Sequence, residues 1–212
     1  FAPLLEKIFK GMRKVDIDSS HEPDVYIANS STVASRIQKI YNRPAQVINY
    51  PIDSHKFLYS VDKEDFYLIS SRLIGYKRID IAIEAFNWLG LPLIIIGNGP
   101  ERENLEAKAL ENIQFLGHVS DRDRTQLMSK ARAVIVTGLE DYGLVPIEAN
   151  ASGTPVIAYG AGGILDTQID GITGILFKPQ TPEALQAALL DNKKKKWDNE
   201  KIKNHALNNF SE

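Results

Sequence analysis

The stretch AVIVTGLEDYGLVPIEANASGTPVIAY, residues 133–159, contains two short apolar runs separated by a segment with a helical pattern. The runs AVIVT and TPVIAY are continuous rather than alternating, which is typical of parallel strands covered on both faces. The stretch therefore predicts a strand, a helix that begins near Gly143, and a second strand. We expect the small residues Ala149, Ala151, Ser152 and Gly153 to let this helix pack closely on the sheet.

The same order of elements repeats along the chain from residue 66 onward. Further apolar runs are FYLISS (66–71), PLIIIG (92–97), IQFLG (113–117) and GILF (174–177), with amphipathic segments between them. This order predicts an α/β fold with a Rossmann-like, doubly wound parallel sheet. Ser120 with Asp123, and Thr181 with Pro182, are typical helix start signals.

The first 65 residues follow a different pattern. DVYIANS (24–30) and AQVINYPID (45–53) indicate strands, and TVASRIQKIY (32–41) indicates a helix between them. Two strands alone do not build a stable two-faced sheet. This segment is therefore interpreted as the tail of another domain.

These patterns predict three parts of the chain. Residues 1–50 are expected to be a remnant of an N-terminal domain, residues 51–65 an interdomain linker, and residues 66–212 a C-terminal domain. We expect a longer protein to be cut at both ends, with the second cut before a final crossover helix, because HALNNFSE lacks a helix stop signal.

The composition excludes several classes of function. Lys and Arg number 25 against 27 Asp and Glu, so there is no electrostatic signature of nucleic-acid binding. The absence of cysteine excludes disulfides, thiolate metal sites and a cysteine nucleophile. No apolar run approaches the roughly 20 residues of a membrane span, and the N-terminus lacks the order of a signal peptide. We therefore expect a cytoplasmic protein, and we interpret the Lys run at 193–196 as solvated surface.

Candidate ligand-binding residues follow the predicted strands, because open parallel sheets bind ligands beyond the carboxyl ends of their strands. These residues are Arg72, Gly75, Lys77, Asn98, Gly99, Pro100, His118, Gly138, Glu140, Asp141, Gly143 and the glycine-rich segment 160–163. They are all expected at one edge of the sheet.

This edge combines groups that bind phosphate with groups that bind hydroxyls. Arg72 and Lys77 supply permanent charge, and the backbone at Gly143 and Leu144 opens a helix whose free N–H groups favour an anion. Ionised carboxylates accept hydrogen bonds, so Glu140 and Glu148 beside such a clamp suit a sugar nucleotide. Their spacing alone instead favours a loop acid at Glu140 and a surface helix residue at Glu148. For Asn150 a solvated or capping role is expected, with a polar pocket residue as the alternative.

Four segments together resemble the donor-binding half of retaining GT-B glycosyltransferases of family four. They are SRLIGYKRIDIAIEAFN, IIIGNGPERENLEAKA, NIQFLGHVSDRD and EDYGLVPIEANASGTPVIAYGAGGILDTQIDGITGILF. The likeness is to the bacterial mannosyltransferase-like members that build O-antigen and exopolysaccharide. Its most specific element is the Glu-x7-Glu motif, Glu140 to Glu148.

The resemblance implies a role for each matching residue. Arg72 and Lys77 are similar to the pair that binds the donor diphosphate and neutralises the leaving group, and Glu140 to the acid that holds the transferred sugar. Glu148 is similar to the acid that binds the ribose diol. The remaining substrate-binding residues implied by the resemblance are Leu116, Gly117 and His118 for the base, Gly143 and Leu144 for phosphate, and Gly97 and Gly99.

The resemblance also implies the partners of the intact protein. The donor is expected to be GDP-mannose or a UDP-sugar, and the acceptor a glycan or lipid-linked molecule bound through the N-terminal domain that is largely missing here. No cofactor, metal or nucleic acid is expected, and peripheral association of the full-length protein with the inner face of the membrane stays open. The chain by itself is expected to bind donor and to be inactive.

The motifs argue against several other classes of protein. A dinucleotide-dependent oxidoreductase needs a Gly-x-Gly-x-x-Gly turn, but Pro100, Glu101 and Arg102 follow Gly97-Asn98-Gly99. The Gly-Lys-Ser/Thr ending of a phosphate-binding loop is absent. Asp121-Arg122-Asp123 suggests the metal site of a metal-dependent transferase, but the helix start better explains why these residues occur there. A GT-B epimerase or phosphorylase and a non-catalytic nucleotide-sugar-binding module remain as alternatives.

Overall fold

The computed structural model of the chain describes residues 2–212. These residues form two compact units that divide between Asn49 and Tyr50. Among the described residues, no helix has both the length and the hydrophobicity needed to cross a membrane.

The first unit contains two helices and a pair of parallel strands. Its elements are α1 (Ala2–Ser19), β1 (Tyr26–Ala28), α2 (Ser31–Tyr41) and β2 (Ala45–Val47). The strand, helix and strand predicted for residues 24–53 are therefore confirmed.

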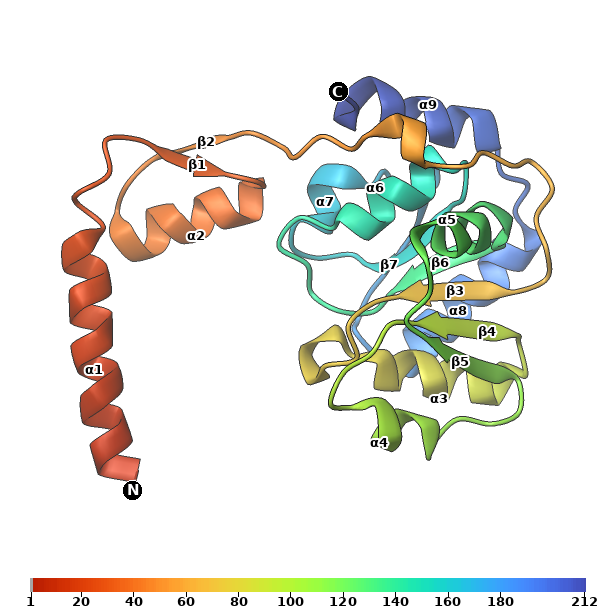
Figure 1. Cartoon of the computed structure of the whole chain (residues 1–212), viewed down its shortest axis with the longest axis horizontal. Coiled ribbons are helices and arrows are strands. Elements are labelled where there is room, and N and C mark those ends of the chain that lie inside the picture. Colours follow the sequence, from red (N-terminus) through yellow and green to blue (C-terminus); the bar gives the residue numbers. More distant parts are fainter. Residues whose placement is uncertain (1) are drawn as a thin grey trace. The chain divides into compact units, whose positions relative to one another are not determined.

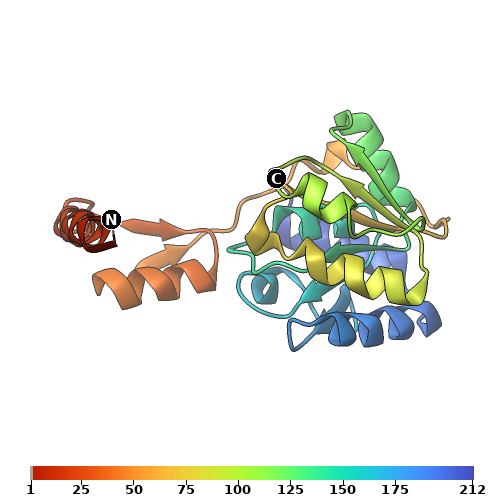
Figure 2. The same cartoon turned by 90° about the horizontal axis from the view of Figure 1, so that it is seen from below.

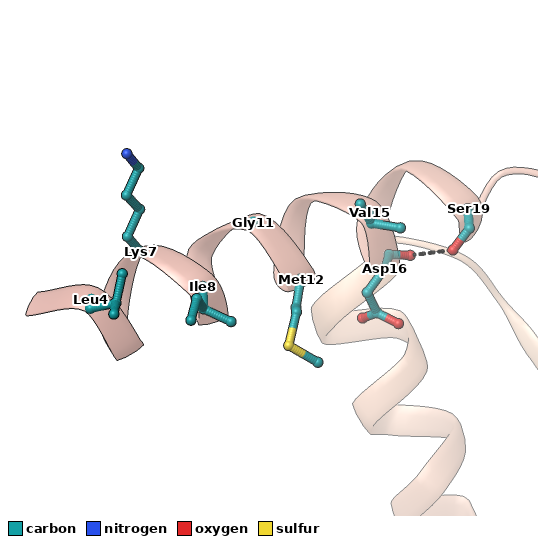
Figure 3. Close-up of a pocket in the computed structure, with 8 residues that line it drawn as sticks. All are labelled: Leu4, Lys7, Ile8, Gly11, Met12, Val15, Asp16 and Ser19. Atoms are coloured by element: carbon teal, nitrogen blue, oxygen red, sulfur yellow. Dashed lines mark hydrogen bonds between the residues drawn. The ribbon is translucent and has the colours of Figure 1, made fainter. Parts of the chain in front are cut away.

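Helix α1 was not predicted from the sequence. Its apolar side chains lie largely in solvent, with Leu4, Met12 and Val15 each about 60% exposed or more. Figure 3 shows Ile8 and Met12 projecting from one side of this helix and Lys7 from the other. Polar contacts at its C-terminal end join α1 to the rest of the unit: the Tyr41 hydroxyl donates to Asp16 Oδ2 at 3.0 Å.

The second unit is built on one parallel sheet. Its strands are β3 (Tyr67–Ser70), β4 (Leu93–Ile96), β5 (Ile113–Gly117), β6 (Ala133–Val136), β7 (Val156–Tyr159) and β8 (Gly174–Phe177). All pair in parallel in the order β5-β4-β3-β6-β7-β8 (Figure 1). Each strand falls within a predicted apolar run, so the Rossmann-like, doubly wound sheet is confirmed, and its strand order reverses between β3 and β6.

Helices cover both faces of this sheet. The helices of the second unit are η1 (Ser54–Lys56), η2 (Gly75–Lys77), α3 (Ile79–Leu89), α4 (Arg102–Glu106), α5 (Asp121–Lys130), α6 (Leu144–Ala151), α7 (Ile164–Thr167), α8 (Pro182–Lys194) and α9 (Asn199–Phe210). Buried side chains of α3, α4 and α8 pack on one face, where α3 (yellow) and α8 (blue) lie side by side (Figure 2). Side chains of α5, α6 and α7 pack on the other face.

The predicted helix starts and the surface Lys run agree with the structure. The Ser120 hydroxyl accepts a hydrogen bond from Asp123 N at 3.1 Å, and the Thr181 hydroxyl accepts one from Ala184 N at 3.3 Å. The four Lys side chains at 193–196 are exposed.

The segment expected to be an interdomain linker, residues 51–65, lies in the second unit. Ile52 is buried beside α9, and its N–H donates to Phe210 O at 2.6 Å. Lys63 donates to Ser129 O and Thr154 Oγ1 at 2.7 Å each. The units therefore divide before this segment, and the segment packs on the body that follows it.

The expectation for Asn150 is wrong. Its side chain is 1% exposed and sits in the interior, where Nδ2 donates to Thr154 O and Thr173 O at 3.1 Å each. Its Oδ1 accepts from Gln168 Nε2 at 2.8 Å. Asn150 therefore cross-links α6 to the loops before β7 and β8, which a solvated or capping residue would not do.

The small residues of α6 divide their contacts between two partners. Ala149 packs on the sheet with Val134 and Val156, as expected. Ala151 instead packs with Ile52 and Phe210, because α9 covers the outer side of α6 (Figure 1). The expectation that all four small residues serve packing on the sheet was therefore correct only in part.

We predict that Asn150→Leu lowers the free energy of unfolding by about 2–4 kcal/mol, because it leaves Thr154 O without a buried donor and removes one hydrogen bond each from Thr173 O and Gln168 Nε2. The measurement is urea unfolding followed by circular dichroism. Asn204→Leu is the matched control, since Asn204 is an exposed residue of α9. Equal midpoints for the two variants would contradict the cross-link.

Candidate functional site

The loops after β5, β4 and β3 are hydrogen-bonded to one another at the carboxyl edge of the sheet. Gly97 N donates to Gly117 O at 2.7 Å, and Leu73 N donates to Asn98 O at 2.9 Å. Glycine is required where these loops meet: a Cβ on Gly97 would lie 1.9 Å from Ser71 O, and one on Gly99 would lie 2.2 Å from Leu73 O. The glycines predicted as site residues thus allow the backbones to approach closely.

The loops after β3, β6 and β7 continue the same edge. Thr137 Oγ1 donates to Lys77 O at 2.8 Å, and a Cβ on Gly138 would lie 2.8 Å from Lys77 Cα. Gly163 N donates to Glu140 O at 2.8 Å. The predicted loop residues therefore form one continuous rim, and its centre is the point where the strand order reverses.

Lys77 and Glu140 form an ion pair at that centre. Lys77 Nζ lies 2.6 Å from Glu140 Oε1 and 2.9 Å from Oε2, and the two side chains are 17% and 18% exposed. Lys77 ends the 3-10 helix η2 after β3, whereas Glu140 follows β6. Two residues that were assigned to the same edge from the sequence are thus brought into direct contact.

Arg72 lies on the same loop as Lys77 and is exposed. Its guanidinium donates to the Tyr76 hydroxyl at 3.4 Å. A guanidinium carries five N–H donors, so further donors of Arg72 can bind an anion. The Tyr76 ring also lies 5.1 Å from Lys77 Nζ, which keeps both cations close to one aromatic side chain.

Helix α6 begins at Leu144, as predicted. Gly143 is its N-cap with φ of 92°, which favours glycine, and it makes no side-chain capping hydrogen bond. The N-terminal N–H groups of a helix attract anions when no side chain caps them. The Leu144 side chain is exposed, so these amides lie at the surface of the rim.

Tyr142, next to Gly143, holds this turn in place through its buried side chain. Its side chain is buried, and its hydroxyl donates to Tyr50 O at 2.9 Å. Burial, with a smaller effect from the charge of Asp166, raises the pKa of Tyr142 to about 12. The phenol therefore stays protonated and keeps this hydrogen bond at neutral pH.

Glu148 has a cationic partner that the sequence did not reveal. Arg124 Nη1 lies 2.5 Å from Glu148 Oε2, and these side chains are 24% and 17% exposed. Asp121 Oδ1 lies 3.8 Å from Arg124 Nε. Arg124 belongs to α5, and no spacing rule links it to α6, so only the packing of the two helices brings the pair together. Within residues 2–212 no hydrogen bond or ion pair joins the Arg124–Glu148 pair to Lys77 or Glu140.

The segment predicted to meet a base lies at the end of β5. Leu116 and His118 are exposed, and Gly117 adopts a φ of 68°. A Cβ on Gly117 would lie 2.8 Å from Arg102 Nη1. The segment is therefore accessible, and its conformation places the Arg102 guanidinium against Gly117.

The comparison with known families covers most of the second unit. Residues 52–209 match the family described as glycosyl transferases group 1. The chain belongs to this family.

Two curated glycosyltransferases are among its relatives. The D-rhamnosyltransferase WbpZ of Pseudomonas aeruginosa is 26% identical over 80% of this chain and 50% of its own length. The O-antigen chain mannosyltransferase C of Escherichia coli is 24% identical over 96% of this chain and 56% of its own length. The chain thus spans about half the length of these relatives.

Solved glycosyltransferase structures share the fold of this chain. Anabaena HepE in complex with UDP and glucose superposes with a TM-score of 0.81 at 22% identity, over 94% of this chain and 62% of HepE. Sucrose-phosphate synthase of Thermosynechococcus elongatus superposes with a TM-score of 0.84 at 23% identity, over 95% of this chain and 58% of its own. At this level of identity the likeness shows the GT-B fold alone.

The acidic groups of this glycosyltransferase domain are dispersed. Within the part of the chain that the structure describes, no three His, Asp or Glu side chains are grouped to hold a metal ion. Glu140 and Glu148 each face a cation instead.

We predict that Lys77→Met and Glu140→Gln each lower the free energy of unfolding by about 1–3 kcal/mol, since each leaves a half-buried charge unpaired. The double variant should lose less than the sum, with a coupling of about 1 kcal/mol or more in a double-mutant cycle. The control cycle is Lys56→Met with Asp53→Asn, because that pair is 73% and 39% exposed and should couple weakly. Equal coupling in both cycles would contradict a special role for the central pair.

Proposed function

We propose that this chain is the donor-binding half of a glycosyltransferase that transfers a hexose from a nucleoside-diphosphate sugar to a glycan or lipid-linked acceptor, with retention of anomeric configuration. The observation that carries the proposal is the Lys77–Glu140 ion pair at the reversal of strand order, on the same rim as the uncapped N-terminus of α6. Family membership and the UDP and glucose named with HepE support it.

The Lys77–Glu140 pair is suited to contact both parts of such a donor, the phosphate and the sugar. An ammonium has three N–H donors, and two of them reach the oxygens of Glu140. The third is left for a phosphate oxygen. Glu140 in turn keeps acceptor sites on both oxygens for sugar hydroxyls, since a carboxylate accepts about four hydrogen bonds. The ion pair thus orients the acid that holds the sugar and the cation that holds the phosphate.

Arg72 and the amides at Gly143 and Leu144 complete the diphosphate site. Breaking the bond between the anomeric carbon and the phosphate oxygen leaves negative charge on the nucleoside diphosphate. Preorganised cations and amides stabilise that charge as it develops. The acceptor oxygen forms the new bond to the anomeric carbon on the same face, and its proton passes to the departing phosphate oxygen. This route needs no side-chain nucleophile, metal or cofactor.

Glu148 is assigned to the ribose diol, with Arg124 as a positioning residue. Arg124 occupies Oε2 of Glu148, which leaves Oε1 to accept from a ribose hydroxyl. The arginine also offsets the cost of holding a carboxylate in a half-buried position. Leu116, Gly117 and His118 are assigned to the base, and Gly97 and Gly99 to the close backbone approach beside it.

The intact protein is proposed to act in the cytoplasm, including at the inner face of the membrane where a lipid-linked acceptor would lie. Acceptor recognition is assigned to a further domain, since this chain matches only about half the length of its relatives. GDP-mannose and UDP-sugars are the proposed donors.

We predict that one of GDP, UDP and ADP raises the melting temperature of this chain, because a ligand that binds only the folded state stabilises it. For that nucleotide, Glu148→Gln and Arg124→Leu should each weaken binding by about tenfold in calorimetry, the scale of one charge-assisted hydrogen bond. Both variants should also bind the ribose form of the nucleotide with less preference over its 2′-deoxyribose form.

Glu200→Gln, an exposed change on α9, is the control. No shift with any nucleotide would refute the donor site, and an unchanged ribose preference in Arg124→Leu would make that arginine purely structural.

In the intact protein, Arg72→Ala and Lys77→Ala should each lower kcat by about 10²- to 10³-fold, the scale of removing one preorganised partner of the developing charge. Product analysis should show a new glycosidic bond with the wild type. The controls are the exposed Arg122→Ala and Lys201→Ala, which should retain activity. Nucleotide binding without sugar transfer would favour a non-catalytic module, and wild-type turnover in either site variant would refute the clamp.

A further inference from the structure

A polar pocket of about 250 Å³ lies at the amino-terminal edge of the sheet. It is lined by Lys63 before β3, Arg132 before β6, and residues where α8 gives way to α9, including Asn192, Lys193, Lys195 and Trp197. In Figure 1 the arrowheads of β3 and β4 point away from the segment that joins α8 to α9. This site, called the basic pocket below, is therefore at the edge opposite the donor site.

The basic pocket concentrates positive charge in a chain whose net charge is −2. Four of its lining residues are Lys or Arg, and none is Asp or Glu. Arg132 has an acidic partner, Asp65, at 3.1 Å, and this aspartate is 73% exposed. Among the described residues, no carboxylate forms an ion pair with Lys63, Lys193 or Lys195. Lys77 of the donor site has an acidic partner, whereas three of the four cations of the basic pocket have none in this part of the chain.

Lys63 is the innermost of these cations. Its ammonium donates to Ser129 O and Thr154 Oγ1, which are both neutral. Burial, reinforced by the charge of Lys130, lowers the pKa of Lys63 to about 7. A buried ammonium with neutral partners is costly, and a bound anion would offset that cost.

The outer wall of the basic pocket is held by specific contacts. Trp197 Nε1 donates to Asn192 Oδ1 at 2.8 Å. Lys195 Nζ donates to Gly171 O at 2.6 Å and lies 4.3 Å from the centre of the Trp197 ring. These contacts place Trp197 and Lys195 together at the mouth of the basic pocket, where the fluorescence of the indole can report on a bound ion.

The volume restricts what the basic pocket can hold. Pockets for drug-sized ligands start at about 300 Å³, whereas a water takes about 30 Å³ in the liquid. A pocket of about 250 Å³ therefore suits a small hydrated anion rather than a whole nucleotide. Ammonium groups and an Arg side chain are the partners that phosphate oxygens prefer.

We propose that the basic pocket binds a phosphoryl group at a site separate from the donor site. The group can come from a free phosphate ion or from the head group of an anionic lipid, since both present the same oxygens. The proposal does not depend on the proposed glycosyltransferase reaction.

The test uses the whole chain with Trp88→Phe, which leaves Trp197 as the single tryptophan. Inorganic phosphate is titrated at constant ionic strength, and Trp197 fluorescence is recorded. We expect a saturable change that persists when Lys77→Met is added to disable the donor site. Lys193→Gln with Lys195→Gln should raise the Kd by about tenfold or more, because charge-assisted hydrogen bonds are lost.

The matched control is Lys194→Gln with Lys196→Gln. It removes the same charge from the same exposed run, but neither residue lines the pocket. This control should change the Kd by less than about twofold, since only long-range screened charge is lost. The proposal is overturned by the lack of a saturable change, by its loss in Lys77→Met, or by equal weakening in the two Lys pairs.

Sedimentation with lipid vesicles identifies the source of the phosphoryl group. Vesicles of phosphatidylcholine with about 30% phosphatidylglycerol supply anionic head groups, and pure phosphatidylcholine vesicles are the control. Co-sedimentation that is lost in the Lys193/Lys195 variant and kept in the Lys194/Lys196 variant supports a lipid head group. Phosphate binding without co-sedimentation supports a free anion.

Discussion

The parallel pairing of β3 with β6 is the constraint on which the arrangement of the site depends. Tyr67 pairs with Ala133 and Leu68 with Val134, so two segments far apart in the sequence become neighbours at the centre of the sheet. The loops after both strands then leave the same edge, and Thr137 fixes the backbone of Lys77 directly. The Lys77–Glu140 contact follows from this pairing, because each residue lies a few positions beyond the end of its strand.

Both acids of the Glu-x7-Glu motif face a cation in this structure, and the two pairs differ in origin. Lys77 reaches Glu140 across the rim between two strand ends, whereas Arg124 reaches Glu148 between two helices. In each pair the carboxylate is oriented before a ligand arrives, and part of its desolvation cost is already offset. A donor would then add hydrogen bonds to groups that are already in place.

The opposite edge of the same sheet has a different electrostatic character. Four cations line the basic pocket, and Arg132 alone among its lining residues has an acidic partner within the described chain. Lys63 is held by neutral oxygens, although it is largely buried. The two proposed phosphate sites thus lie at opposite ends of the strands of one parallel sheet, and they share no residue.

The sequence by itself determined the strands, the helix starts and the residues of the carboxyl edge. Continuous apolar runs identify buried parallel strands, and local signals such as Ser120 and Thr181 act within one turn, so both can be recognised without the fold. The tertiary structure alone decided the partners: Arg124 with Glu148, Asn150 inside a buried network, and Lys63 beside Arg132 in the basic pocket. These contacts join side chains from elements that no periodicity relates, because their geometry is set only when helices pack on the assembled sheet.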